Sequence, residues 1–397
     1  MTGERATSRS HPFLEPSVPA IVILVLGRLF LAGAFVASQS EGANLGDDVA
    51  RVHEIAHTEG TPWQDFDVEY APLEAIVIEL VGRGTLAYTG RAIVVLAVFA
   101  DLTAAAAIGF GWGRSAAGRY LLLGLPLLTF IYFRLDAVPV ALAASGLALA
   151  KRDREVQGGI SLAAGILMKF WPVVVAPALI LQRRRRAFTA AAVSTVIGLT
   201  AWVTFAGLSG ASQVTTFRGA TGWHVESVIG SVVWVVTGAD AVIEQGAARV
   251  GTVPGALLAA LAVCAVLTEV AIWSRARSFG GDPVGAPSVT SVAALLMFSP
   301  LFSPQYALWL TPFVAVAVAE GAGRSLALPG AAVVFITGVI SAMRIVQTAL
   351  SVDVQQMLLL VRNGAVIGVV VWWFVASGRT STISADATLA RRLTADR

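Results

Sequence analysis

Charge is scarce in this chain of 397 residues. Asp, Glu, Lys and Arg together make up 13% of it, whereas soluble domains carry about 25%. Hydrophobic residues make up 56%, which exceeds the roughly 45–50% of soluble domains. These proportions exclude an ordinary soluble domain and predict an all-α polytopic membrane protein that sits in the lipid bilayer.

Cysteine and histidine are also rare. The single cysteine, Cys264, lies inside an apolar run and has no second thiol with which to form a disulfide. The four histidines show no ligand spacing around His224, and the carboxylates show none of the spacings of calcium or zinc sites, so we expect no metal and no cofactor. The basic residues fall in short clusters between apolar runs, and this excludes a soluble basic domain that binds nucleic acid.

Apolar runs recur along the chain and predict its membrane helices. We expect spans at residues 18–37, 91–112, 120–133, 137–150, 187–205, 251–273, 289–301, 307–319, 326–343 and 354–376. Several are shorter than the roughly 20 residues of a straight crossing, so about 10–12 transmembrane or half-membrane helices are predicted. Broken helices at membrane depth indicate a cavity. Arg28 in the first span is expected to face the bundle interior or this cavity, and the alternative is an arginine that snorkels to an interface.

The arginine clusters predict the orientation, because cytoplasmic loops are enriched in Lys and Arg. The basic stretches 114–119, 151–154, 183–186 and 275–277 are assigned to the cytoplasm, with a leader at 1–17 and a disordered tail at 379–397. The membrane domain then covers 18–378, and its first extracytoplasmic loop covers about 39–70. The loops with the candidate site residues all fall on the extracytoplasmic face of what we expect to be the plasma membrane.

The first outer loop is strongly acidic. It sets eight carboxylates against one arginine, Arg51, between two apolar stretches. The carboxylates are Glu41, Asp47, Asp48, Glu54, Glu59, Asp65, Asp67 and Glu69. A long acidic loop held between membrane spans is typical of an active-site loop at a bilayer face.

A re-entrant hairpin is predicted at residues 158–182. Basic clusters flank both ends, yet the stretch is too long for one crossing and too short for two. Pro172 disfavours helix at Trp171, so the chain should fold back near Lys169. An intramembrane lysine is a functional hypothesis by default, and its natural partner here is a phosphate that arrives from the lipid. The alternative is a structural pair between Lys169 and a carboxylate.

Further polar residues fall on the same face. In the connection between two short spans, Arg134 is expected to grip a phosphate or a sugar hydroxyl that Asp136 orients, and a structural pair between the two is the alternative. His224 and Glu226 precede an apolar stretch that predicts a helix, either at the membrane–water interface or dipping into the cavity.

Two prolines break a helix pair at residues 298–306. This break presents Gln305 and Tyr306 outward, where ligand contact and a simple turn are alternative roles.

Taken in chain order, these motifs resemble those of glycosyltransferase family 87, polyprenyl-phosphate-mannose-dependent alpha-mannosyltransferases of the C-type superfamily. The resemblance runs from about residue 46 to 310. The matching stretches are GDD (46–48) with HEIA (53–56), GTPWQD (60–65), VEYAPL (68–73), RLD (134–136), KFWP (169–172), HVES (224–227) and SPQY (303–306).

The resemblance implies a C-type glycosyltransferase fold and a sugar transfer outside the cytoplasm, with Asp48 as general base and Asp47 as its competitor. The donor is then a polyprenyl-phosphate sugar, most simply mannose, and the acceptor a glycolipid or glycan, with inversion at the anomeric carbon. Lys169 and Arg134 would bind the donor phosphate. The remaining expected substrate contacts are Asp65, Glu69, Tyr70, Asp136, His224, Glu226, Gln305 and Tyr306.

Two other function classes stay open from the residues alone. A transporter or lipid-linked sugar flippase would also have broken helices and a midplane lysine, although no internal repeat is visible. A non-catalytic membrane scaffold would leave Lys169 unexplained. The Ala- and Gly-rich spans suit packing within one chain, so a monomer is expected.

Overall fold

The computed structural model describes residues 16–39, 47–215, 219–321, 324–345 and 351–395. Within these residues six helices are long and apolar enough to cross a membrane. They belong to α1 (Val18–Ser38), α4 (Leu86–Trp112), α10 (Arg185–Ser212), α12 (Gly255–Phe279), α15 (Arg324–Ile345) and α16 (Val352–Ala395). The all-α polytopic membrane class predicted from composition is confirmed.

Shorter apolar helices complete the bundle in the described part of the chain. They are α7 (Ala137–Lys151), α8 (Glu155–Met168), η3 (Trp171–Val175) with α9 (Pro177–Leu181), α11 (Val228–Thr237), α13 (Ala286–Phe298), and η6 (Pro304–Leu310) with α14 (Thr311–Ala319). The connecting helices are α2 (Asp47–His57), α3 (Pro72–Gly82), α5 (Arg114–Leu123), η2 (Leu125–Leu127), α6 (Leu128–Ile131) and η4 (Gln213–Thr215). Half-height helices are therefore as frequent as the sequence predicted.

Arg28 in α1 faces the bundle interior, as predicted. It is fully buried and pairs with Asp101 of α4, with 2.8 Å between Nε and Oδ2. Its Nη2 also donates to the carbonyl oxygen of Leu121 at 2.5 Å, and the Tyr120 hydroxyl donates to the other Asp101 oxygen at 2.8 Å. The guanidinium and the carboxylate thus satisfy each other away from lipid, which rules out snorkelling to an interface.

The re-entrant hairpin is present where Pro172 and the basic flanks predicted it. Helix α8 ends at Met168, Lys169 is extended with φ −158° and ψ 125°, and the chain continues through η3 into α9. Pro177 has no N–H to donate back to the carbonyl of Val174. That carbonyl accepts instead from Trp273 Nε1 at 3.0 Å and from Ser291 Oγ at 2.9 Å, so α12 and α13 satisfy the broken helix from outside.

The carboxyl group of Glu269 contacts Ser291, one of the two side chains that satisfy the Val174 carbonyl. Glu269 lies in α12, whose surface otherwise faces lipid, and its Oε2 is 2.5 Å from Ser291 Oγ. The Ser291 hydroxyl thus lies within hydrogen-bond distance of both the Val174 carbonyl and Glu269, and it links α12 and α13 to the broken helix.

A small antiparallel sheet, with one strand before α11 and two after it, was not predicted. Its strands β1 (Trp223–His224), β2 (Val242–Glu244) and β3 (Ala247–Val250) lie in the order β1-β3-β2. The two residues between β2 and β3, Gln245 and Gly246, have φ of 52° and 74°. Positive φ at both central residues is the requirement of the tight hairpin turn whose twist matches that of the strands.

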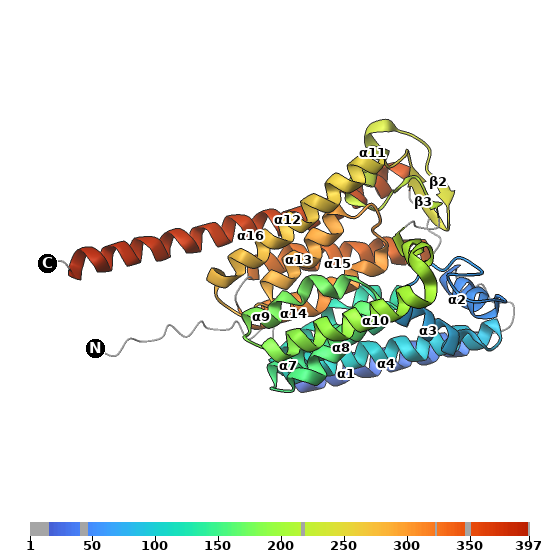
Figure 1. Cartoon of the computed structure of the whole chain (residues 1–397), viewed down its shortest axis with the longest axis horizontal. Helices are drawn as coiled ribbons and strands as arrows, with labels where there is room; N and C mark the ends of the chain where they lie inside the picture. Colours follow the sequence, from blue (N-terminus) through green and yellow to red (C-terminus); the bar gives the residue numbers. More distant parts are fainter. Residues whose placement is uncertain (1–15, 40–46, 216–218, 322–323, 346–350, 396–397) are drawn as a thin grey trace.

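The acidic loop and this hairpin lie at the same end of the molecule. Figure 1 shows α2 beside β2 and β3 at one end, far from the last part of α16. The backbone of α16 stays helical to Ala395, which differs from the disordered tail predicted from residue 379. Once an apolar span has nucleated a helix, each further residue adds one hydrogen bond, so a polar extension continues it. The leader at 1–15 lies outside the described residues, and its location and that of the tail stay predictions.

Candidate active site

A cavity of about 1620 Å³ opens between the acidic loop and the hairpin. Pockets for small ligands are usually about 300–1,000 Å³, so this one has room for two substrates. It brings together most of the side chains predicted from the sequence. These are Asp48, Glu69, Tyr70, Arg134, Asp136, Lys169, His224, Glu226, Gln305 and Tyr306.

Two predicted residues are not placed against the cavity. Asp65 does not line it; its Oδ2 accepts the backbone N–H of Thr61 at 2.6 Å and closes a turn within the acidic loop. Asp47 begins α2, and its side chain lies outside the described part of the structure.

Asp48 and Arg134 form an ion pair at the cavity wall. Asp48 lies in the first turn of α2, and Arg134 lies in the connection between α6 and α7, where its guanidinium also packs 4.3 Å from the centre of the Phe130 ring. The bond joins Arg134 Nη2 to Asp48 Oδ2. The expected structural pair between Arg134 and Asp136 is therefore not the arrangement seen. A guanidinium carries five N–H donors, so Arg134 can hold Asp48 and a second anion together.

Lys169 is also paired to carboxylates, which was the alternative to phosphate binding in the sequence analysis. Its Nζ lies 3.0 Å from Asp136 Oδ1 and 3.4 Å from Glu74 Oε1, and both acids are almost fully buried. Trp309 Nε1 adds a hydrogen bond to Asp136 Oδ1 at 3.3 Å. Two carboxylates face one ammonium, so the cluster carries a net charge of −1 when all three groups are ionised.

Glu69 is held by Arg51 in a two-pronged contact. Nε donates to Oε1 at 3.1 Å and Nη2 donates to Oε2 at 2.8 Å, and the hydrogen bonds to Glu69 raise the pKa of Arg51 above its ordinary value. Burial, together with the negative charges of Asp48 and Glu69, raises the pKa of the neighbouring Tyr70 hydroxyl well above its usual range. Tyr70 therefore stays protonated and can donate a hydrogen bond into the cavity.

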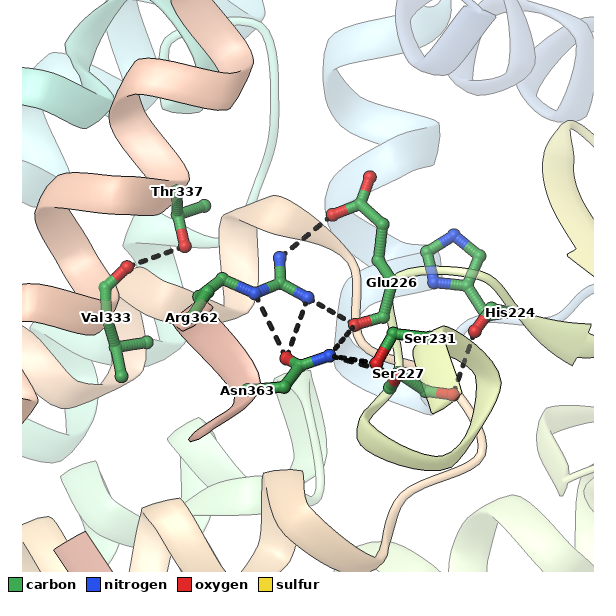
Figure 2. A network of polar contacts seen from close by, with 8 residues as sticks. All are labelled: His224, Glu226, Ser227, Ser231, Val333, Thr337, Arg362 and Asn363. Atoms are coloured by element: carbon green, nitrogen blue, oxygen red, sulfur yellow. Dashed lines mark hydrogen bonds and ion pairs between the residues drawn. The ribbon is translucent and has the colours of Figure 1, made fainter. Parts of the chain in front are cut away.

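The opposite wall is built on the last span. Glu226 follows β1, and its Oε2 accepts from Nη1 of Arg362 in α16 at 3.0 Å; both side chains are buried. Asn363 Nδ2 donates to the carbonyl of Ser227 at 3.1 Å and to Ser231 Oγ at 2.8 Å (Figure 2). The segment from β1 to α11 is thus fastened to α16 by a polar network.

The sequence profile of glycosyltransferase family 87 matches residues 70–304, more than half of the chain. The chain belongs to glycosyltransferase family 87. No curated protein matches it. Membership of this family supports a membrane glycosyltransferase rather than a transporter, a flippase or a non-catalytic scaffold.

The family match covers part of the cavity. Arg134, Asp136, Lys169, His224 and Glu226 fall inside the matched residues. Asp48 and Gln305 fall outside them but line the same cavity, so the fold of this family 87 glycosyltransferase unites both sets.

Sequence reasoning missed three charged residues of this glycosyltransferase. Glu74, Arg249 and Arg362 each line the cavity or hold a residue that does. The available signal was a carboxylate or an arginine inside an apolar helix, which marks Glu74 and Arg362 as candidates by the same rule that singled out Lys169. Arg249 carried no such signal because its strand was not predicted.

Sequence reasoning also passed over a metal-like motif. His53 and His57 have the H-E-x-x-H spacing of zinc-protease helices. In the structure His53 Nδ1 lies 3.3 Å from Thr89 Oγ1 and His57 Nδ1 lies 2.8 Å from the His53 carbonyl. Among the residues described, no cluster of three His, Cys, Asp or Glu side chains is arranged to hold a metal ion.

Proposed function

We propose that this glycosyltransferase moves a hexose, most simply mannose, from a polyprenyl-phosphate sugar to an extracytoplasmic glycolipid or glycan, with inversion. The supporting observation is that a carboxylate, Asp48, and two cations, Arg134 and Lys169, line one cavity. An acid that accepts a proton and cations that stabilise a departing phosphate are the two requirements of a transfer from a phosphate leaving group.

Among the cavity carboxylates, Asp48 and Glu54 are the ones that a substrate can reach, and of these two Asp48 is the one paired to Arg134. The Asp48 side chain is 38% exposed, against 18% for Glu69 and 2–4% for Glu74, Asp136 and Glu226. As general base it would take the proton of the acceptor hydroxyl while that oxygen attacks the anomeric carbon. Asp47 remains the competitor for this role.

Arg134 is placed to hold the base and the leaving group in one geometry. With Nη2 on Asp48, its other N–H groups are available for a phosphate oxygen. Lys169 would add positive charge near the same phosphate. Because it already pairs with two carboxylates, Glu74 and Asp136, it would attract the phosphate less strongly than Arg134 does.

The arginine clusters between the spans support the proposed orientation. Because cytoplasmic loops are enriched in Lys and Arg, we assign the cavity to the extracytoplasmic side of the plasma membrane, where a lipid-linked donor would arrive laterally. No metal takes part, because the proposed leaving group is a monophosphate that Arg134 and Lys169 bind directly.

Transfer in membranes from radiolabelled polyprenyl-phosphate mannose tests the proposal. Asp48→Asn should lower the rate by about 10²–10⁴, the usual contribution of a general base. Asp67→Asn is the matched control, since Asp67 is an exposed carboxylate of the same loop that does not line the cavity. Full activity in Asp48→Asn would exclude Asp48 and direct attention to Asp47, and no transfer by the wild-type protein would refute the donor.

A further inference from the structure

Glu74 gives the proposed donor site an excess of negative charge. Lys169 Nζ lies 3.4 Å from Glu74 Oε1 and 3.0 Å from Asp136 Oδ1. The two acidic side chains are 4% and 3% exposed, whereas the Lys169 side chain is 20% exposed and lines the cavity. A bound phosphate adds another negative charge to this cluster. Like charges at one poorly solvated site disfavour ionisation of all of them, so one of the two carboxyl groups is expected to take up a proton.

Glu74 is the acid that the structure stabilises less in its ionised form. Asp136 accepts from Lys169 at the shorter distance and also from Trp309 Nε1 at 3.3 Å. Among the residues described, the Glu74 carboxyl has Lys169 as its one hydrogen-bond donor. Fewer donors stabilise a carboxylate less, and glutamate also has the higher intrinsic pKa of the two residue types. These differences favour the proton on Glu74.

Charged side chains on the neighbouring helices α2, α4, α8 and α10 are engaged elsewhere. They form the pairs Arg134–Asp48, Arg51–Glu69, Arg51–Glu54 and Arg28–Asp101, and Arg91 donates to the carbonyl of Gln39. His53 and His57 of α2 contact Thr89 and the His53 carbonyl. Glu155, Arg185 and Arg186 lie at the opposite end of α8 and α10 from Lys169. The other titratable groups that line the cavity are Tyr70, His224, Glu226, Arg249 and Tyr306. Among the described contacts, Lys169 is thus the cation that faces Glu74 directly.

We propose that Glu74 carries a proton when the donor phosphate is bound, and that this proton leaves the charge of Lys169 available to the phosphate. The proposal rests on the proposed function and adds Glu74 to it as a positioning residue that acts through Lys169. With Glu74 neutral, Lys169 and Asp136 balance each other and the cluster no longer repels an anion. An ammonium has three N–H donors, so the one that Asp136 and Glu74 do not use can bind a phosphate oxygen. The proton comes from water in the cavity, which Glu74 lines.

The direction of the pH dependence follows from the charges. Burial raises the pKa of Glu74 to about 7, Lys169 opposes this rise, and the charge of Asp136 adds to it. The donor phosphate raises the same pKa further, because its negative charge disfavours the carboxylate. Donor affinity is therefore fully present below about pH 7 and weakens as the pH rises above it. The donor is a phosphodiester, whose charge does not change in this range. A rise of about one pKa unit on binding limits the loss of affinity to about tenfold.

Calorimetry measures the coupled proton. The full chain in nanodiscs, without acceptor, is titrated with farnesyl-phosphate mannose in HEPES and in Tris at about pH 7.5. Because the two buffers release protons with different heats, the difference in binding enthalpy gives the number of protons taken up. We expect about half a proton in the wild type, for a pKa that rises by about one unit, and none in Glu74→Gln. Glu79→Gln should behave as wild type, since Glu79 is a carboxylate of the same helix that pairs with Arg83 away from the cavity.

Two calorimetric results would overturn the proposal. One is the absence of proton uptake by the wild type. The other is unchanged uptake in Glu74→Gln, which would assign the proton to another group of the cavity. His224 is the alternative, because histidine also changes charge in this range of pH.

Kinetics give a second readout of the same proton. The wild-type donor KM in the transfer assay should rise about five- to tenfold between about pH 6 and pH 9, whereas that of Glu74→Gln should stay within about twofold. A parallel rise in both proteins would contradict the role of Glu74.

Infrared spectra separate this proposal from the proposed function, because they need no donor. Difference spectra between acidic and alkaline samples should show the C=O stretch of a protonated carboxyl that disappears as the pH rises through about 7 and is missing in Glu74→Gln. A Glu74 that titrates in the ordinary range of glutamate, at about pH 4–5, would overturn the proposal. The expected band in a protein that neither binds nor transfers the donor would instead refute the proposed function and leave the protonation of Glu74 standing.

Discussion

Replacing Lys169 with methionine separates its structural role from its proposed chemical one. In the folded protein Nζ lies 3.0 Å from Asp136 and 3.4 Å from Glu74. Methionine has a similar length and no charge, so Lys169→Met removes the only cation that pairs with these two acids among the described contacts. Two nearly buried carboxylates are then left to repel each other.

The magnitude follows from the burial of the pair. At an effective dielectric constant near 20, unit charges about 3 Å apart attract by roughly 5 kcal/mol, which desolvation of the ions offsets in part. Removing one partner of a buried pair costs about 3–5 kcal/mol, because the remaining charge is uncompensated. We therefore expect Lys169→Met to lose about 3–5 kcal/mol of unfolding free energy, measured by SDS titration in mixed micelles with tryptophan fluorescence.

A compensated variant is the matched control. Lys169→Met combined with Asp136→Asn and Glu74→Gln removes all three charges and should regain most of the lost stability. If Lys169 also binds the donor phosphate, this stable variant still transfers sugar poorly and shows a raised donor KM. Recovery of wild-type transfer would leave Lys169 with a structural role alone. If Lys169→Met alone is as stable as wild type, the expected cost of leaving two buried carboxylates without their cation is refuted.

Three further predictions concern the other charged groups and metals. Arg134→Lys keeps the charge but loses the forked set of guanidinium N–H donors that can hold Asp48 and a phosphate together. The donor KM in the transfer assay should therefore rise roughly tenfold. An unchanged donor KM would contradict that role. Glu269→Gln should stay within about 1 kcal/mol of wild type in SDS unfolding because the amide oxygen can still accept from Ser291, whereas Glu269→Leu should lose about 1–3 kcal/mol. Equal stability of the two variants would show that the contact is dispensable. Transfer should persist in EDTA, and activity restored only by an added divalent ion would disprove metal-free chemistry.

The transmembrane elements could be predicted because their causes are local. Apolar runs set the spans, and Pro172 together with the basic flanks set the re-entrant hairpin. The burial of Arg28 followed from the cost of charge in lipid. Each of these signals lies within one stretch of sequence, so no knowledge of partners was needed.

The partners of the site residues could not be predicted in the same way. Arg134 has Asp136 two positions away, yet it pairs with Asp48 from a distant part of the chain. Which carboxylate meets which cation depends on how α2, α7 and α8 pack, and local sequence does not encode this. The β2–β3 hairpin was missed because its strands are short and its turn, Gln245–Gly246, lacks the Asn-Gly or Asp-Gly pair that usually signals such a hairpin.

The reversal at Lys169 also has a consequence for insertion into the bilayer. Arg184 pairs with Asp153, so the two ends of the hairpin meet at one surface. A topology prediction that counts the apolar residues of this hairpin as one crossing would assign every later loop to the wrong side of the membrane. Thiol-labelling scans with single cysteines at positions 153 and 183 should therefore report the same compartment. Biosynthesis must deliver this segment to the bilayer while both of its ends stay on one side.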